Sequence, residues 1–111
     1  MNVEQRLTIE RRIVRKLIRT AKEHGWALTR IWDGEENQNP KTEQEAIDVV
    51  FSVDECRMVF RHPSFKSAHC AVIILGNDGW DCIADNSIGE GWDVVIDAID
   101  RYTDQVAEMY C

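Results

Sequence analysis

The sequence has no long apolar run. Its longest stretch of aliphatic residues is Ala71–Leu75, in a chain of 111 residues, whereas a membrane-spanning helix needs about 20 apolar residues. The N-terminal stretch MNVEQRLTIERR is charged from its fourth residue, so it lacks the apolar segment of a secretory signal peptide. We therefore expect a cytoplasmic protein that makes no contact with a membrane.

Motifs of catalysis are also missing. The chain has no G-x-S-x-G, no glycine-rich phosphate loop and no H-E-x-x-H, and it has only three histidines. A nucleophile needs a base and an orienting group beside it. The acid pair Glu35 and Glu36 could in principle exchange protons, but such a pair is more typical of a solvated loop. We expect a protein that is not an enzyme and that uses no cofactor.

The four cysteines are too widely spaced for a zinc site. They stand at positions 56, 70, 82 and 111, and structural zinc sites need pairs such as C-x2-4-C. His69 and Cys70 are adjacent on an expected strand and therefore point to opposite faces. Without a secretory context, free thiols are expected. Cys56, Cys70 and Cys82 are predicted to be small core hydrophobes, with no metal bound.

The stretch LGNDGWDCIADNS, residues 75–87, concentrates Asp78, Asp81 and Asp85. Their spacing is not that of a calcium loop, which needs D-x-[DN]-x-[DN]-G and a later glutamate. Asn77-Asp78-Gly79 instead separates two strand-like runs, and Asn/Asp-Gly suits the positive φ of a tight hairpin. We interpret the aspartates as turn and strand-edge residues.

The change of hydrophobic period along the chain predicts the fold. Helical periods cover residues 3–24, 42–51 and 91–109, and strand-like runs cover 26–32, 56–62, 68–76 and 80–85. The last three strands have connections too short for crossovers and should form an antiparallel meander. The expected architecture is a two-layer α+β domain spanning 1–111, in the order α-β-α-β-β-β-α, with helices packed on an antiparallel sheet. The place of the first strand in the sheet stays open.

Local signals support three of these elements. A stripe on the first helix is expected to face the core; it comprises Val3, Leu7, Val14, Ile18 and Ala21, flanked by Ile13 and Leu17. Gly25 should end that helix, and Thr42 with Glu45 forms a capping box for the second. In the strand 26–32 one face is expected to carry Trp26, Leu28, Arg30 and Trp32. Residues 33–41 are predicted to be a polar loop.

Charge is distributed unevenly along the chain. Residues 1–30 hold eight Lys/Arg and three acids, a balance of +5, whereas residues 31–111 hold five Lys/Arg and seventeen acids, a balance of −12. Such asymmetry bears on partners rather than on fold.

The strongest charge signal is an acidic stripe on the last helix. It consists of Asp93, Asp97, Asp100, Asp104 and Glu108, which recur at helical spacing on one face. The stripe spans about 22 Å at a rise of about 1.5 Å per residue. A solvated helix face has this pattern, and so does a surface complementary to a basic partner, as in a nucleic-acid mimic. We hypothesise that this stripe binds a basic protein surface.

The first helix carries an opposite, basic face. It consists of Arg12, Arg15, Lys16, Arg19 and Lys22, which could neutralise phosphates. The rival hypothesis is therefore direct nucleic-acid binding through this face. The chain's pI near 4.9 speaks against it. As a third use, the basic and acidic helices could pair side by side in one chain, or between two chains in a homodimer.

Four segments also carry a resemblance: IERRIVRKLI, DGEE, FSVDE and GNDGWDCIAD. With them the chain resembles a group of small acidic proteins from phages, prophages and plasmids. The resemblance implies a setting among the accessory genes of mobile elements, where small acidic proteins often inhibit host defence or regulatory machinery. It assigns no site residue, and likeness of fold does not establish function.

Overall fold

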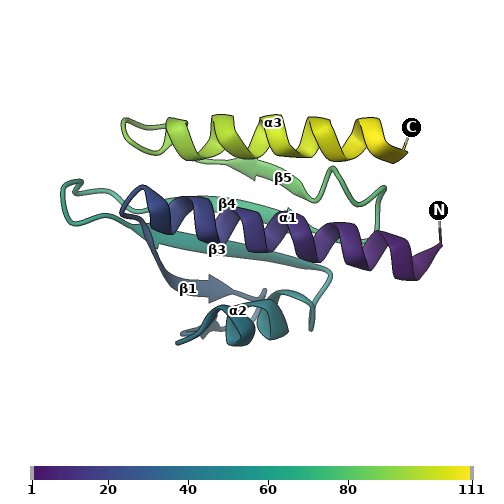
Figure 1. Ribbon diagram of the computed structural model, residues 1–111. Helices are drawn as coiled ribbons and strands as arrows, with labels where there is room; N and C mark the ends of the chain where they lie inside the picture. Colours follow the sequence, from purple (N-terminus) through teal and green to yellow (C-terminus); the bar gives the residue numbers. More distant parts are fainter. Residues whose placement is uncertain (1, 111) are drawn as a thin grey trace.

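The computed structural model describes residues 2–110, which form three helices and five strands (Figure 1). In chain order these are α1 (Val3–Glu23), β1 (Ala27–Trp32), β2 (Asn37–Gln38), α2 (Glu43–Val50), β3 (Glu55–Arg61), β4 (His69–Ile74), β5 (Ile83–Asn86) and α3 (Asp93–Tyr110). The predicted α+β class is confirmed. The predicted elements all lie within a few residues of their expected bounds, and β2 is an addition to them.

All five strands belong to one antiparallel sheet, in the order β2-β1-β3-β4-β5. The last three make the predicted meander: Met58 of β3 lies opposite Ala71 of β4, and Val72 of β4 opposite Asp85 of β5. β1 joins the sheet beside β3, where Ile31 lies opposite Met58. The segment between β2 and β3 contains α2. It therefore crosses β1, because β2 and β3 lie on opposite sides of that strand in the sheet.

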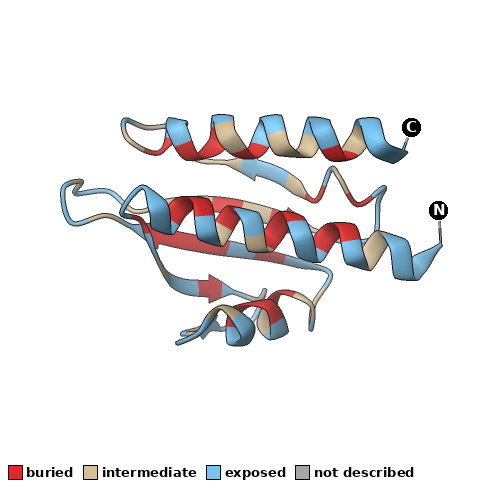
Figure 2. Ribbon diagram, viewed as in Figure 1, coloured by how far each residue is buried: buried red, intermediate tan, exposed pale blue. Residues whose placement is uncertain are grey.

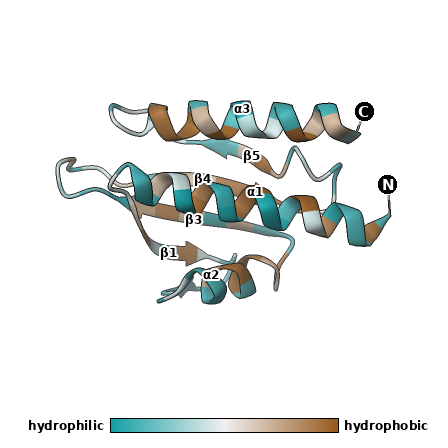
Figure 3. Ribbon diagram, in the orientation of Figure 1, coloured by the Kyte–Doolittle hydropathy of each residue, from teal (hydrophilic) through white to brown (hydrophobic). Residues whose placement is uncertain are grey.

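The three helices cover one face of the sheet, with α1 between α2 and α3 (Figure 1). Buried residues recur along the helices and the strands of the sheet (Figure 2), and many of the same positions are hydrophobic (Figure 3). The largest fully buried side chains include Trp26, Trp92, Phe60, Ile9, Ile13, Leu17, Ile31, Met58, Ile73 and Ile99. Each such side chain contributes about 1.5–3 kcal/mol when it leaves water. The core thus lies in a single layer between helices and sheet.

Local capping sets the ends of the helices. Asn2 and Gln5 form a reciprocal capping box at the start of α1. Gly25, at φ +86°, ends α1 as predicted, in a conformation that suits glycine. At α2 the predicted box is only half formed. Thr42 accepts from the backbone N–H of Glu45 at 3.1 Å, but the Glu45 carboxylate reaches Lys41 N, at 2.7 Å, instead of the capping residue.

The buried stripe of α1 confirms the predicted one except at its start. Val14 and Ala21 are buried as predicted, together with the flanking Ile13 and Leu17, whereas Val3 is 61% exposed. The first turn of α1 extends past the strands (Figure 1), so Val3 has no sheet beneath it.

The predicted alternation along the first strand is wrong beyond Leu28. A β-bulge between Leu28 and Arg30 shifts the register against β3. A bulge adds one residue, so the side chains after it change faces. Ile31 therefore enters the core, and Trp32, expected on the same face as the buried Trp26, stands on the opposite face and is 41% exposed.

The predicted loop 33–41 contains a short strand. Asp33 closes the turn after β1, because its Oδ1 accepts from the backbone N–H groups of Glu35 and Glu36, both at 2.9 Å. These hydrogen bonds hold the pKa of Asp33 below its ordinary value. The turn brings β2 alongside the end of β1.

The hairpin between β4 and β5 is present, but its turn is longer than predicted. In the described chain positive φ occurs only at glycines, here Gly76 (+102°) and Gly79 (+101°), and not at Asn77 or Asp78. Residues 75–82 form a loop, so Trp80 packs against the core from the loop and not from a strand.

Candidate functional site

The acidic stripe of α3 is a continuous exposed surface. All five of its carboxylates are exposed. Among residues 2–110, no ion pair engages any of them. Asp93 alone accepts a side-chain hydrogen bond, from the Gly89 backbone N–H at 3.1 Å, at the start of the helix. The stripe is therefore free to meet a partner.

At the centre of the stripe, the environment disfavours the ionised form of a carboxylate, that of Asp100. Partial burial, followed by the charges of Asp104 and Asp97, raises the pKa of Asp100 above its ordinary value. The ionised form of Asp100 is thus disfavoured in the folded protein. A cation placed against the stripe would relieve this cost.

The basic face of α1 is partly occupied within the molecule. Glu43 of α2 lies 3.1 Å from Arg15 and 3.2 Å from Arg19, and Arg15 also donates to Gln44 at 2.9 Å. Burial by itself would raise the pKa of Glu43. The hydrogen bonds and charges of the two arginines outweigh burial and hold it below its ordinary value. Two of the five predicted cations therefore serve to hold α2 against α1.

The remaining cations of this face are more open. Lys16 lies over the ring of Tyr102 in α3, with Nζ 5.5 Å from the ring centroid. Arg12 and Lys22 are exposed, and neither has an ion pair within the described chain. A hollow of about 340 Å³ runs along this side of α1 and reaches Tyr102.

The basic and acidic helices do lie side by side, as one hypothesis proposed. Their charges, however, do not pair. In the part of the chain that the structure describes, no ion pair joins α1 to α3, and the contact between Lys16 and Tyr102 involves an aromatic ring. The acidic stripe and the basic face are therefore two separate surfaces.

A further surface, which sequence reasoning missed, is the sheet face that the helices leave uncovered. Two hollows of about 180 and 260 Å³ lie on it, and both are lined by Trp32 and Arg57. The alternation of β3 did separate Arg57, Val59 and Arg61 from the core side chains. The bulge in β1, which brings Trp32 to the same face, leaves no clear signal in the sequence.

The thiols and carboxylates that the structure describes form no metal-binding cluster. Within residues 2–110, no group of three or more His, Cys, Asp or Glu side chains is placed to hold a metal ion. Burial raises the pKa of both Cys56 and Cys82 to about 12, so both are protonated and unreactive at neutral pH. Cys70, predicted in the core, instead lies half-buried on the uncovered face, with its Sγ 3.3 Å from the Ser87 hydroxyl.

No protein-family model, curated protein or solved structure matches this chain. Over residues 2–110, no helix is both long and apolar enough to cross a membrane.

Proposed function

We propose that the protein is a non-enzymatic interaction module that docks on a basic protein surface through the acidic stripe of α3. One observation carries this proposal: five exposed carboxylates share one helix face, and no cation within residues 2–110 pairs with them. A helix face that contacts only solvent does not require its carboxylates to be aligned in one row. Each pair of like charges at i,i+4 costs a few tenths of a kcal/mol. Their mutual repulsion favours a cationic partner.

The spacing of the charges suits a surface that normally binds nucleic acid. The stripe places five charges over about 22 Å, and one strand of duplex DNA carries about six phosphates over that length. A cationic groove of a host regulatory or defence protein is therefore a suitable partner. Charge complementarity would steer the association, which should weaken as salt rises.

The test replaces the stripe and keeps a control of equal charge. In the stripe variant, all four aspartates become Asn and Glu108 becomes Gln. The control neutralises five exposed acids that have no side-chain hydrogen bond in the described chain: Glu4, Glu23, Glu35, Asp54 and Glu90. Both variants and the native protein are used to capture host proteins from lysate, and any captured protein is purified for titration at two salt concentrations.

We expect the native protein and the control to bind the same basic partner, with an affinity that falls as salt rises, and the stripe variant to lose it. If the folded stripe variant keeps every partner, the stripe is only a solvated face and the proposal is wrong.

The alternative is nucleic-acid binding through the basic face of α1. The hollow along α1 favours it, and the engagement of Arg15 and Arg19 by Glu43 weakens it. A mobility-shift assay with duplex DNA at low salt separates the two functions. A shift of the DNA band that is lost in the Arg12→Ala and Lys22→Ala variants would support the alternative.

A further inference from the structure

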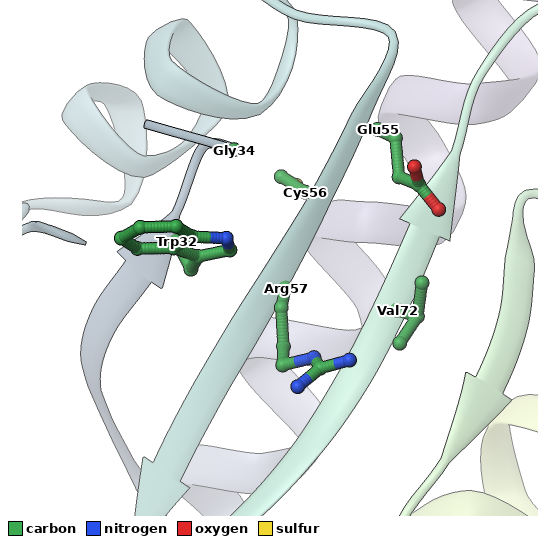
Figure 4. Close-up of a pocket in the computed structure, with 6 residues that line it drawn as sticks. All are labelled: Trp32, Gly34, Glu55, Cys56, Arg57 and Val72. Atoms are coloured by element: carbon green, nitrogen blue, oxygen red, sulfur yellow. The ribbon is translucent and has the colours of Figure 1, made fainter. Parts of the chain in front are cut away.

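The uncovered sheet face combines arginines with apolar and aromatic side chains. Register across β1, β3 and β4 places on it Arg30, Trp32, Arg57, Val59, Arg61, Val72 and Ile74. In the middle row Trp32 lies opposite Arg57, and Arg57 opposite Val72. Figure 4 shows these three side chains together, with α1 behind the strands. The helices thus do not cover this face.

The arginines of this face are unpaired within residues 2–110. None of Arg30, Arg57 and Arg61 has an ion pair or a side-chain hydrogen bond there. Two carboxylates also lie on the face. Glu55, at the start of β3, lines the smaller hollow together with Trp32 and Arg57, and Asp85 of β5 lies opposite Val72. The cations are grouped on β1 and β3, around Trp32 and Val59, so an anionic ligand has a defined place.

The size of the face argues against a second copy of this chain. The sheet is five strands wide, roughly 24 Å at about 4.8 Å spacing, and its three longer strands have six or seven residues, roughly 20–24 Å. Because the edge strands have only two and four residues, the flat area of the face stays under about 500 Å² per copy. Two copies would bury about 1,000 Å², at the lower limit for a stable dimer. Face-to-face pairing would also bring the three arginines of each copy close to those of the other, which costs energy.

The hollows suit a single flat ring. At about 180 and 260 Å³ they are smaller than pockets for drug-sized ligands, which measure about 300–1,000 Å³. Trp32 lines both hollows, so its indole is accessible at this surface. Exposed aromatics on a sheet, flanked by cations, are how proteins stack splayed bases and hold the adjoining phosphates.

We infer that the uncovered sheet face binds single-stranded nucleic acid, with one base stacked on Trp32 and the neighbouring phosphates held by Arg57, Arg30 and Arg61. The inference is independent of the acidic stripe. That stripe belongs to the helical layer on the other side of the sheet, in a molecule whose smallest extent is 20 Å. At physiological salt, charges are screened over about 8 Å, so the stripe does not prevent binding at the opposite face.

The experiment measures the fluorescence anisotropy of a labelled fifteen-residue oligo-thymidine, titrated with the full-length protein. The variants are Trp32→Ala, Trp32→Phe and Arg57→Ala. Arg12→Ala is the matched control, because it removes an exposed arginine from α1. Circular dichroism and Tm confirm that each variant is folded, which is expected because the three side chains, Trp32, Arg57 and Arg12, are exposed.

We expect the native protein to bind with a Kd of about 10–100 µM at physiological salt, about 0.15 M. Trp32→Ala should weaken binding by about 5- to 150-fold, as loss of one stacked base does, while Trp32→Phe keeps most of it. Arg57→Ala should reduce the slope of log K against log salt by about 0.7. Arg12→Ala and the stripe variant of α3 should bind as the native protein does, so failure here and failure of the proposed function are distinguishable.

Three results would overturn the inference. The first is no saturation at about 1 mM native protein, ten times the weakest Kd expected. The second is a loss with Arg12→Ala equal to that with Arg57→Ala, which would move the site to α1. The third is a dimer in sedimentation that Trp32→Ala dissociates without any oligonucleotide binding, which would assign the face to a second copy.

Discussion

Glu10 is a carboxylate with no exposed surface on the buried side of α1. Its Oε2 accepts from the backbone N–H of Gly76 at 2.9 Å, and its Oε1 lies 3.4 Å from Nε of Arg6. These contacts tie α1 to the start of the β4–β5 loop. A buried charge of this kind is costly when its partners are lost, so the pair fixes how the helix sits on the sheet.

We expect Glu10→Ala to lower the free energy of unfolding by about 3 kcal/mol, because Arg6 and the Gly76 N–H lose their partner. Glu10→Gln should cost less, since its amide oxygen can still accept from Gly76. Urea denaturation measures both. Glu4→Ala, on the exposed first turn, is the control and should change stability by well under about 1 kcal/mol. A Glu10→Ala protein as stable as this control would show that the tie is unimportant.

Gly79 offers a second test at the scale of one residue. It has φ +101°, and a Cβ there would lie 3.2 Å from Cγ2 of Ile9. We expect Gly79→Ala to destabilise the protein by about 2–3 kcal/mol, from backbone strain together with crowding. Gly34, also at φ +101° but with no atom within 4 Å of an added Cβ, isolates the strain alone. In thermal unfolding, Gly79→Ala should therefore have a lower Tm than Gly34→Ala. Equal Tm values would mean that Ile9 moves aside freely.

At the scale of elements, the contact of α2 with α1 depends on Glu43 and is sensitive to acid. The pKa of Glu43 lies below its ordinary value of 4.5 when the protein is folded. Its contribution to stability is therefore complete above about pH 4.5 and is lost as the pH falls through the lower, folded pKa.

We expect Glu43→Gln to cost up to about 1 kcal/mol at pH 7, because the arginines are partly exposed and screened. The difference should shrink as the pH falls through the lower, folded pKa, because Glu43 is then protonated in both the folded and the unfolded protein. Urea titrations at pH 7 and at a series of acidic pH values measure this. A difference that grows in acid would contradict the ion-pair account.

Asp100 in α3 should show the opposite sign. Its pKa is raised in the folded protein, so ionisation opposes folding, and the chain gains stability as the pH falls through the folded pKa toward 3.8. We expect Asp100→Asn to raise the free energy of unfolding at pH 7 by about 0.5 kcal/mol, the size of like-charge i,i+3 and i,i+4 effects, and the gain to vanish below about pH 3. Asp78→Asn, outside the stripe, serves as control in the same denaturation series. A loss of stability at pH 7 would show that the stripe is not self-repulsive.

The sequence predicted most elements because their signals are local. Gly25 ends α1, and the short connections after β3 force a meander, whatever the rest of the chain does. The place of β1 could not be predicted, because pairing with β3 depends on contacts between distant segments. The bulge after Leu28 is a second such feature: it reverses the faces of Ile31 and Trp32 through pairing with β3, so strict alternation failed there.

The candidate sites also differ in how far they could be predicted from the sequence. The acidic stripe could be read from helical spacing, and the structure places its five members on the exposed face. The engagement of Arg15 and Arg19 by Glu43 could not, since these residues lie more than 20 positions apart. A surface assembled from β1, β3 and β4 needs the register of three strands, which one sequence does not supply.

At the scale of the whole molecule, the acidic stripe and the sheet arginines lie on opposite sides of the protein. The helical layer presents the acidic stripe, and the uncovered sheet presents Arg30, Arg57 and Arg61, in a chain of net charge −7. Two ligands of opposite charge could therefore bind without competing. The packed core lies between these two surfaces and separates them. Its buried thiols allow the integrity of the core to be measured.

Cys56 and Cys82 report on that core. Both are buried, with pKa values raised to about 12. In a Cys111→Ser background at pH 8, we expect a thiol reagent to modify only Cys70 in the native protein, and the other two at the rate of global unfolding. Labelling by mass spectrometry, with and without urea, checks this. Prompt native-state modification of Cys82 would reveal local opening of the β4–β5 loop.

The sheet ends on both sides in very short strands, β2 with two residues and β5 with four. An exposed strand edge is a template on which another chain can extend the hydrogen-bonded ladder, and brevity removes most of that template. The register shift opposite β5, between Val72 and Ile73, interrupts it further. Growth into fibrils by backbone addition is thereby hindered at the β5 edge. On the other side β2 pairs only with Ile31 and Trp32 of β1, so protection against such addition is weaker there.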